Sequence, residues 1–357
     1  MQAINRRANI AAMAFVMALC QVAALHAAAA TLTIQKSFVK LIDTGLEDGD
    51  PHLSPRKAGK WLDDHRLLAR VSAQDELSGP RVRYRGRTVL YDLSSRKTVD
   101  IMKYASPICW DPVSGKGALA VNDDPYDKSN KKQTVVGIRI DSGGKLTEQV
   151  SGLLRGNLGA DCDVQRPNSS NERVLYPLRP EHGILDAGMR GKRDNEQAMF
   201  IRSDGQRIEL PRKGDRVNEV RYLAFSDRYQ ISSWDDCSSA GTPCPPEIHL
   251  MDGKGGISLV TIPSEINHTI SRYGTYYVVK DGILVETRSD SAPEGYFLLR
   301  DGVLHWLWKP GSSGFLDPER TEHWGRPALS PDGCKVAFTR GHRPSRIYVF
   351  DHCAVGK

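Results

Sequence analysis

The chain has 357 residues, of which 39% are hydrophobic and 26% are charged, with a formal net charge of +6. This is enough apolar material for a sizeable core, and the length allows one large all-β domain or two smaller ones. The charges are interspersed without a long block of one sign, which argues against a nucleic-acid-binding protein, because such proteins carry a basic stripe. We therefore expect no nucleic-acid partner.

The first thirty residues have the pattern of a secretory signal peptide. Arg6-Arg7 is followed by an apolar run from Ala11 to Leu25 and then by small residues, Ala27 to Ala30. A basic start, an apolar centre and a small-residue cleavage site predict residues 1–30 as a signal peptide. An uncleaved membrane anchor is the alternative, although the run is barely long enough to span a bilayer. We expect the mature protein to be periplasmic or secreted, without stable membrane insertion.

Six short apolar strands that end in aspartate recur along the rest of the chain. Their aspartates are Asp92, Asp141, Asp204, Asp252, Asp301 and Asp351. Four of the five intervals are about 49 residues, and a fixed period of this size is typical of repeat architectures. The remaining interval, from Asp141 to Asp204, is 63 residues. We attribute its extra length to an insertion near Glu181 to Gln197, where glycines and charges favour a surface loop.

Each repeat contains further strand signals around its aspartate. Turn residues precede alternating apolar runs at Asp64-His65, Ser226-Asp227, Asp281-Gly282 and Asp332-Gly333, and in most repeats another short strand follows the aspartate. Four antiparallel strands per unit, repeated six times, predict an all-β fold, a six-bladed β-propeller that forms a single domain over residues 31–357. Packing the blades in a ring buries both faces of each sheet.

The last repeat has room for only three strands before the chain ends. Thr31 to Ile42 alternates with period 2, as a half-buried strand does. We expect this N-terminal strand to complete the last blade and close the ring.

The motif Pro327-Ala328-Leu329-Ser330-Pro331-Asp332-Gly333, continued by Lys335 to Phe338 and Ile347 to Asp351, resembles the repeat of the TolB-like six-bladed propellers. This WD40-like repeat is also called PD40. In the second and third repeats, Asp111 to Gly115 and Arg166-Pro167-Asn168 stand where Ser-Pro-Asp-Gly is expected. The resemblance implies a periplasmic or secreted binding scaffold, which we expect to be a monomer.

Six cysteines follow the signal peptide, and an even number in an exported protein favours disulfides. Cys334 and Cys353 flank a predicted hairpin turning at Arg343-Pro344 and would face each other across it. Cys237 and Cys244 close a short loop, and Cys109 and Cys162 are paired by elimination. Buried free thiols are the alternative for all six.

Propeller ligands usually meet the loops and strand starts around the central channel, so residues there are the default site. We assign as candidate binding residues at the channel mouth His52, Asp161, Asp163, His268, Arg272 and His323. Each one, taken singly, is more often structural. Asp123, Asp124 and Asp127 offer hard oxygen ligands for a cation in one short loop, with an ordinary acidic loop as the alternative. We expect no cofactor, and the chain has no G-x-S-x-G nucleophile elbow.

These residues predict an exported, non-enzymatic propeller that binds a protein or a cell-envelope component. The alternative is a propeller enzyme (a lactonase, lyase or glycan hydrolase) with a polar or metal site at the channel mouth. Convergence of the candidate carboxylates and histidines within ligand distance would favour the enzyme.

Overall fold

The computed structural model describes residues 33–48, 59–75, 83–121, 134–151, 173–179, 181–189, 197–213, 217–233, 248–263, 266, 275–287, 295–308, 327–340 and 345–355. Every element whose bounds the structure gives in these stretches is a β-strand, and Ile266 alone is helical. Within them, no helix has the length and apolarity that crossing a membrane requires.

The first three sheets each contain four consecutive strands, and we call them blades 1 to 3. Blade 1 consists of β3 (Lys60–Trp61), β4 (Arg66–Asp75), β5 (Arg83–Asp92) and β6 (Lys97–Lys103). Blade 2 consists of β7 (Ala105–Asp111), β8 (Lys116–Val121), β9 (Thr134–Ile140) and β10 (Leu146–Ser151). Blade 3 consists of β11 (Arg173–Pro177), β12 (Gly183–Met189), β13 (Gln197–Arg202) and β14 (Arg207–Lys213).

The other three sheets are blades 4 to 6, and two of them include N-terminal strands. Blade 4 consists of β15 (Val217–Leu223), β16 (Arg228–Ser233), β17 (Ile248–Asp252) and β18 (Ile257–Val260). Blade 5 consists of β19 (Thr275–Val279), β20 (Gly282–Thr287), β21 (Gly295–Arg300), β22 (Val303–Trp308) and β1 (Thr33–Phe38). Blade 6 consists of β23 (Ala328–Leu329), β24 (Lys335–Arg340), β25 (Ser345–Asp351) and β2 (Leu41–Asp48).

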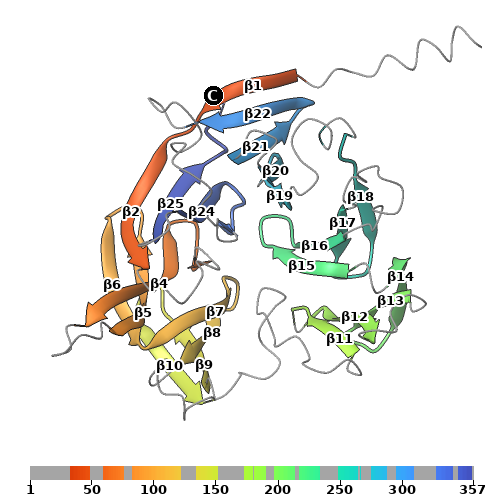
Figure 1. Cartoon of the computed structure of the whole chain (residues 1–357). Helices are drawn as coiled ribbons and strands as arrows, with labels where there is room; N and C mark the ends of the chain where they lie inside the picture. The colour runs from red at the N-terminus through yellow and green to blue at the C-terminus, as the bar shows by residue number, and fades with distance from the viewer. Residues whose placement is uncertain are drawn as a thin grey trace, which may run out of the picture.

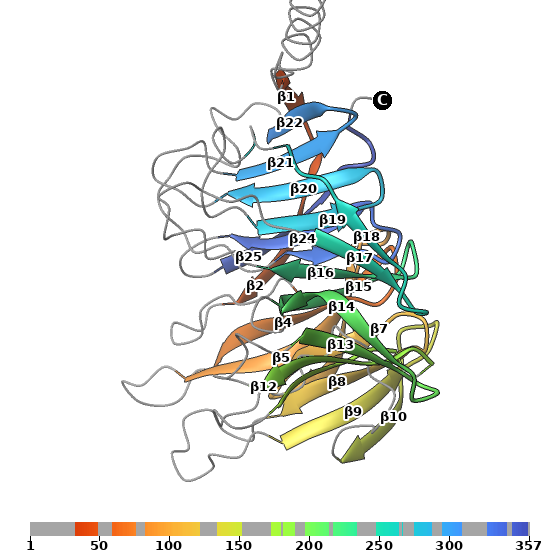
Figure 2. The ribbon, with the colours of Figure 1, turned by 90° about the vertical axis from the view of Figure 1, so that its right-hand side faces the viewer.

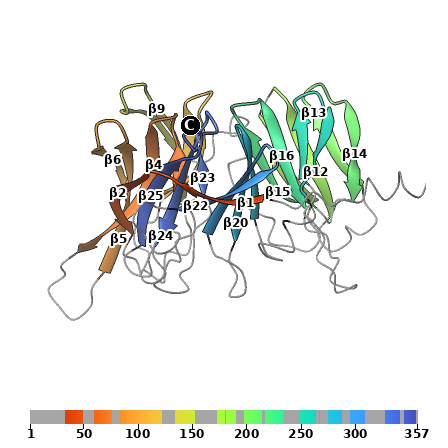
Figure 3. The same ribbon diagram turned by 90° about the horizontal axis from the view of Figure 1, so that it is seen from above.

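The six sheets stand side by side around a central axis, so the predicted six-bladed β-propeller is confirmed (Figure 1). Apart from β1, neighbouring strands within each blade are antiparallel. The turns that join the first strand to the second and the third to the fourth therefore lie at one end of the blades (Figures 2 and 3). We call this the tight-turn end.

The N-terminal segment closes the ring by pairing with two neighbouring blades. β2 is antiparallel to β25, with Leu41 opposite Phe350, and it is the fourth strand of blade 6. β1 is parallel to β22, with Thr33 opposite Val303, and it adds a fifth strand to blade 5. Residues 33–48 thus hold blades 5 and 6 together at their outer edges.

The closing strand differs in its residues from the one predicted. Of Thr31 to Ile42, only Leu41 and Ile42 lie in β2, whereas Thr33–Phe38 pairs with blade 5. The run divides into two strands because Val39, which lies between β1 and β2, is fixed to blade 5. Its N–H donates to the Trp308 carbonyl at 2.8 Å. Val39 is buried among residues of blades 5 and 6. This contact interrupts the alternation, so one apparent strand becomes two.

Apolar clusters fill the interfaces between blades. Clusters shared by both partners lie between blades 1 and 2, 3 and 4, 4 and 5, 5 and 6, and 6 and 1. Trp306 packs against the cluster between blades 4 and 5, where its ring stacks on that of Phe297. A smaller cluster of Cys109 and Ala118 lies on the face of blade 2 opposite the one that contacts blade 1.

The predicted insertion near Glu181 to Gln197 is wrong. Gly183–Met189 is β12, the second strand of blade 3, and Leu185 and Ala187 are fully buried. The extra residues of the long repeat fall instead between Ser151 and Arg173, where β10 ends and β11 begins. The glycines and the aspartate of GILDAGM are typical of a loop, so the sequence did not predict this strand, which is buried by packing against blade 4.

The turn between the first and second strands was predicted correctly in blade 2 but not in blade 3. Asp111 to Gly115 joins β7 to β8, as expected. In blade 3, the equivalent turn lies between Pro177 and Gly183, and Arg166-Pro167-Asn168 lies outside the described residues.

The Cys334–Cys353 disulfide is present, with Cα atoms 5.2 Å apart. Its position differs by one residue from the expected cross-strand pair. Lys335 pairs with Asp351, so Cys334 lies opposite His352, whose N–H donates to the Cys334 carbonyl at 3.0 Å. Cys353 reaches Cys334 from the turn that follows β25.

Cys109 is also disulfide-bonded, to a partner outside the described residues. The expected partner, Cys162, and the expected Cys237–Cys244 pair likewise lie outside them. Both pairings stay predictions.

Candidate functional site

All of the candidate ligand residues predicted from the sequence lie outside the described residues. This holds for the channel-mouth set and for the cation loop: His52, Asp161, Asp163, His268, Arg272, His323, Asp123, Asp124 and Asp127. They belong to connections that enter a first strand or join a second strand to a third. The described strand ends that flank these connections all lie opposite the tight-turn end, and convergence of the residues stays a prediction.

The repeated aspartates have a structural role at the tight-turn end. In five of the six repeats, the side chain accepts a hydrogen bond from a backbone N–H within the following turn. The Asp252 carboxylate accepts from both Lys254 and Gly256 at 2.8 Å. Although burial opposes the shift, these backbone bonds lower the pKa of Asp252. A carboxylate at this position mimics a backbone turn, which explains why the repeat retains it.

A different set of polar side chains converges at the tight-turn end of blades 2, 3 and 4. We call it the Arg179 cluster, and its members are Asp111, Arg179, Glu181, His182, Tyr222 and Tyr229. Arg179 occupies the turn between β11 and β12. Asp111 ends β7, and Tyr222 and Tyr229 pair across the β15–β16 hairpin.

Arg179 is the centre of the cluster. Its Nη1 lies 3.5 Å from Oδ1 of Asp111, and both side chains are largely buried, with 11% and 6% exposure. Its Nε donates to Glu181, and its guanidinium lies 5.2 Å from the ring centroid of Tyr222. One cation therefore contacts side chains from three consecutive blades.

Tyr229 connects the cluster to the core. Its side chain is fully buried, and its hydroxyl accepts from the N–H of Arg179 at 3.0 Å. The same hydroxyl lies 2.8 Å from Nδ1 of His182. A Cβ at Gly253 would lie 2.4 Å from the His182 ring, so glycine is needed for this close approach.

The ionisation states in the cluster follow from burial and pairing. Burial raises the pKa of Tyr229, and burial together with a hydrogen bond to Asp227 raises the pKa of Tyr222. Burial opposes the charged form of Arg179, but Glu181, Tyr222 and Asp111 still raise its pKa. Both phenols are thus neutral at physiological pH, and Arg179 is charged. Neither phenol can act as a general base there.

The sequence interpretation missed the Arg179 cluster because it assigned Glu181 to an insertion. A signal was available, since Arg179 to His182 sits between an apolar strand and Gly183, as a first-to-second turn does. What the sequence did not show is that residues from three different repeats meet there.

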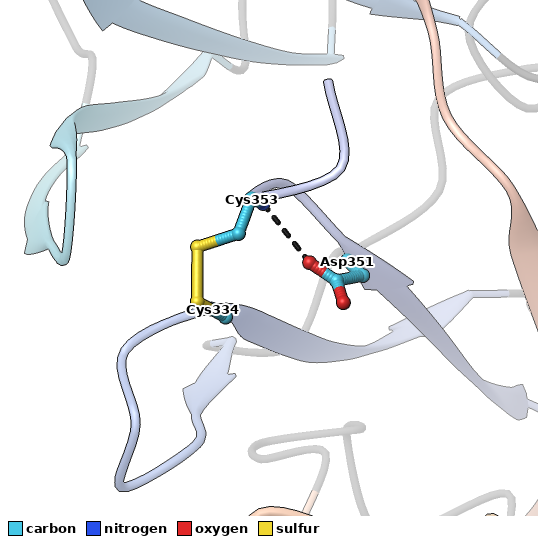
Figure 4. A group of neighbouring side chains, drawn as sticks. All are labelled: Cys334, Asp351 and Cys353. Atoms are coloured by element: carbon cyan, nitrogen blue, oxygen red, sulfur yellow. Dashed lines mark hydrogen bonds between the residues drawn. A yellow bond between two sulfur atoms is a disulfide. The ribbon is translucent and has the colours of Figure 1, made fainter. Parts of the chain in front are cut away.

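A second polar arrangement holds the chain end against blade 5. Arg300 donates from Nη1 to the Val355 carbonyl at 3.0 Å and from Nη2 to the His352 carbonyl at 3.1 Å. Nε2 of the buried His352 donates to the Gly333 carbonyl at 2.7 Å. Next to these contacts, the Cys334–Cys353 disulfide joins the chain end to the start of β24 (Figure 4).

Replacing His352 by glutamine is expected to make stability less dependent on pH between about 7 and 5. Burial lowers the pKa of His352, Arg300 adds to this effect, and the bond to Gly333 opposes it. The unfolded chain, with an ordinary histidine pKa of about 6.5, then takes up the proton more readily than the folded protein. This stability is present above that pKa and is lost as the pH falls, by up to about 1.4 kcal/mol per pH unit.

Glutamine can donate to Gly333 without titrating, so urea unfolding of both proteins at several pH values separates the proton from the hydrogen bond. Burial also lowers the pKa of His305, but His305 is common to both proteins and cancels. Parallel pH profiles would contradict the prediction.

Comparison with known proteins found solved structures of low sequence identity. No protein-family model and no curated protein sequence matches the chain. TolB from Acinetobacter baumannii is 14% identical, with a TM-score of 0.38, over 81% of this chain and 64% of that one. The chain thus spans less than two thirds of the TolB chain.

Two other solved structures belong to enzymes. The β-propeller domain of the Trilobed protease from Pyrococcus furiosus is 14% identical, with a TM-score of 0.33, over 89% of this chain and 83% of that one. Oligogalacturonate lyase from Vibrio parahaemolyticus is 11% identical, with a TM-score of 0.37, over 88% of this chain and 98% of that one. The strand order itself defines a six-bladed β-propeller, and it is this strand order that confirms the fold expected from the resemblance to TolB-like propellers.

Proposed function

We propose that the protein is an exported, non-enzymatic β-propeller that binds a protein or another component of the cell envelope. The observation that carries the proposal is that the charged side chains of the Arg179 cluster are paired with one another. Its cation and carboxylates are paired across blades 2 and 3, and its phenols are neutral hydrogen-bonding groups. Charged groups at the tight-turn end therefore stabilise the ring, which suits a rigid scaffold.

Disulfide chemistry supports the export half of the proposal. Cys334 is bonded to Cys353, and Cys109 is bonded as well. Such bonds persist in oxidising compartments and are rare where thiols are kept reduced. The basic and apolar pattern of residues 1–30 agrees with this compartment.

The binding surface that we propose is the end opposite the tight turns. The connections at that end contain the channel-mouth candidates, and loops on a rigid scaffold are where proteins most often place binding residues. A protein or envelope component is the partner class that this arrangement favours. We propose a monomer, because the ring closes on itself through β2 and leaves no blade incomplete.

Cross-linking in an envelope extract tests the proposal. Wild-type protein is expected to cross-link to a defined component, and the double variant His268→Ala/Arg272→Ala is expected to lose it. Glu148→Ala is the matched control, because Glu148 is exposed on an outer strand of blade 2. Equal cross-linking of all three proteins would place the surface elsewhere. A metal that co-purifies with the oxidised protein and is lost on mutating the channel-mouth residues would favour the enzyme alternative.

A further inference from the structure

One group of side chains in the described part of the chain has the composition of a metal site. It contains Cys334, Asp351 and Cys353, whose potential ligand atoms all lie within 4.8 Å of one another (Figure 4). The two sulfurs form a disulfide in the structure. We propose that reduction of this disulfide creates a site for a thiophilic divalent cation of the zinc class.

A fourth donor comes from the neighbouring blade. Oδ2 of Asp281, in the turn between β19 and β20, lies 3.6 Å from Sγ of Cys353. Asp281 is not one of the three residues whose ligand atoms all lie within 4.8 Å of one another, so its carboxylate must turn toward the ion to complete a set of two sulfurs and two carboxylates from blades 5 and 6. Four ligands of these types are what zinc takes in tetrahedral protein sites.

The backbone already holds the two sulfurs within ligand distance of a common point. Zinc–sulfur bonds of about 2.3 Å in a tetrahedral site place two sulfurs roughly 3.8 Å apart. The Cα atoms of Cys334 and Cys353 are 5.2 Å apart, and both residues lie just beyond the end of the β24–β25 pair, where the N–H of His352 donates to the Cys334 carbonyl. Reduced side chains need only rotate apart to receive the ion.

Reduction of the Cys334–Cys353 disulfide balances in atoms and electrons when a dithiol is the reductant. The dithiol supplies two electrons and two protons and becomes a disulfide, while the Cys334–Cys353 bond breaks to give two thiols. Binding of the dication then displaces two protons and forms two metal–thiolate bonds.

Local charge favours a bound cation over a free thiol pair. Asp351 and Asp281 place negative charge beside the thiols, which disfavours free thiolates. A dication compensates for both the thiolates and the carboxylates. Two described cations near the site are engaged elsewhere: Arg300 donates to three backbone carbonyls, and Lys335 pairs with Asp332.

The metal would keep the chain end attached under reducing conditions. Val355 is buried between blades 5 and 6, and Arg300 holds its carbonyl. A metal bridge between Cys334 and Cys353 replaces the covalent bridge at the same place. This inference is independent of the binding function proposed above.

Cadmium binding to the full-length protein tests the site. After reduction by a phosphine, the protein is expected to bind Cd²⁺ with an ultraviolet thiolate-to-metal band, and the thiols freed from the Cys109 disulfide contribute to the total bound. Mass spectrometry should show that Cd²⁺ protects both Cys334 and Cys353 from alkylation. The oxidised protein should show no band. An absent band, equal binding in the oxidised protein, or unprotected Cys334 and Cys353 would each overturn the proposal.

Conservative variants test the carboxylate ligands. Asp351→Asn and Asp281→Asn should each weaken Cd²⁺ binding by about tenfold or more, since losing even an outer partner of a metal ligand costs roughly 10- to 100-fold. Asp301→Asn should leave it unchanged. Asp301 is the equivalent aspartate of blade 5 and belongs to no such group in the described part of the chain.

Equal affinity in all three variants would refute the four-ligand site. The double variant Cys334→Ser/Cys353→Ser shows by circular dichroism whether the fold survives without the bridge. If its β-sheet spectrum is lost, the reduced protein has no folded site, and the proposal fails.

Discussion

Replacing Arg179 by methionine is expected to lower the free energy of unfolding by about 3–5 kcal/mol, the range found when one partner of a buried ion pair is removed. Asp111 is 6% exposed, and in the described residues Arg179 is the cation that faces it, at 3.5 Å. Methionine keeps the apolar stem of the side chain but leaves the carboxylate buried without its partner. Urea denaturation monitored by tryptophan fluorescence measures the change.

A double-mutant cycle separates the ion pair from the rest of the cluster. Asp111→Asn combined with Arg179→Met is expected to be more stable than Arg179→Met alone, because the uncompensated charge is gone. The residual loss reports the contacts of Arg179 with Glu181 and Tyr222. If the two substitutions were additive, Asp111 and Arg179 would not be coupled, and the scaffold role assigned to the cluster would fail.

Replacing Phe338 by alanine is expected to destabilise the protein by about 3–5 kcal/mol, the range for large-to-small substitution in a packed core. Phe338 is fully buried in β24, between blades 5 and 6. Its ring centroid lies 5.4 Å from that of Tyr296 and 5.7 Å from that of Phe350. Alanine would leave a cavity at the interface that the N-terminal strands also hold together.

Val99→Ala is the control for Phe338→Ala. Val99 lies on the outer strand of blade 1 with 52% exposure, and surface changes of this kind usually cost within about 0.5 kcal/mol. Chemical denaturation of both variants gives the comparison. A loss below about 1 kcal/mol for Phe338→Ala would mean that blades 5 and 6 do not depend on this cluster.

The candidate binding residues at the channel mouth were predicted from the expected order of strands in each blade. The structure confirms that strand order, and the convergence of the residues stays a prediction. The polar cluster that the structure does place together was missed. Asp111, Arg179 and Tyr229 come from three repeats and are dozens of residues apart. Each one alone has an ordinary local context, so only their meeting in space gives them a shared role.

Local sequence patterns by themselves determined that the chain forms six blades. Period-2 alternation decides which face of a strand is buried, and turn residues such as Asp332-Gly333 act within a few bonds, so both are visible in one chain. The repeated aspartates and the Cys334–Cys353 pairing were predictable for the same reason, since each depends on one turn or one hairpin.

Only the tertiary structure decided how the segments far apart in sequence combine. Val39 divides one alternating run into β1 and β2, because its burial between blades 5 and 6 is favourable only once both blades exist. GILDAGM became a strand because blade 4 buries Leu185 and Ala187. In both cases the free energy comes from contacts between distant parts of the chain, and a local pattern holds no record of those contacts.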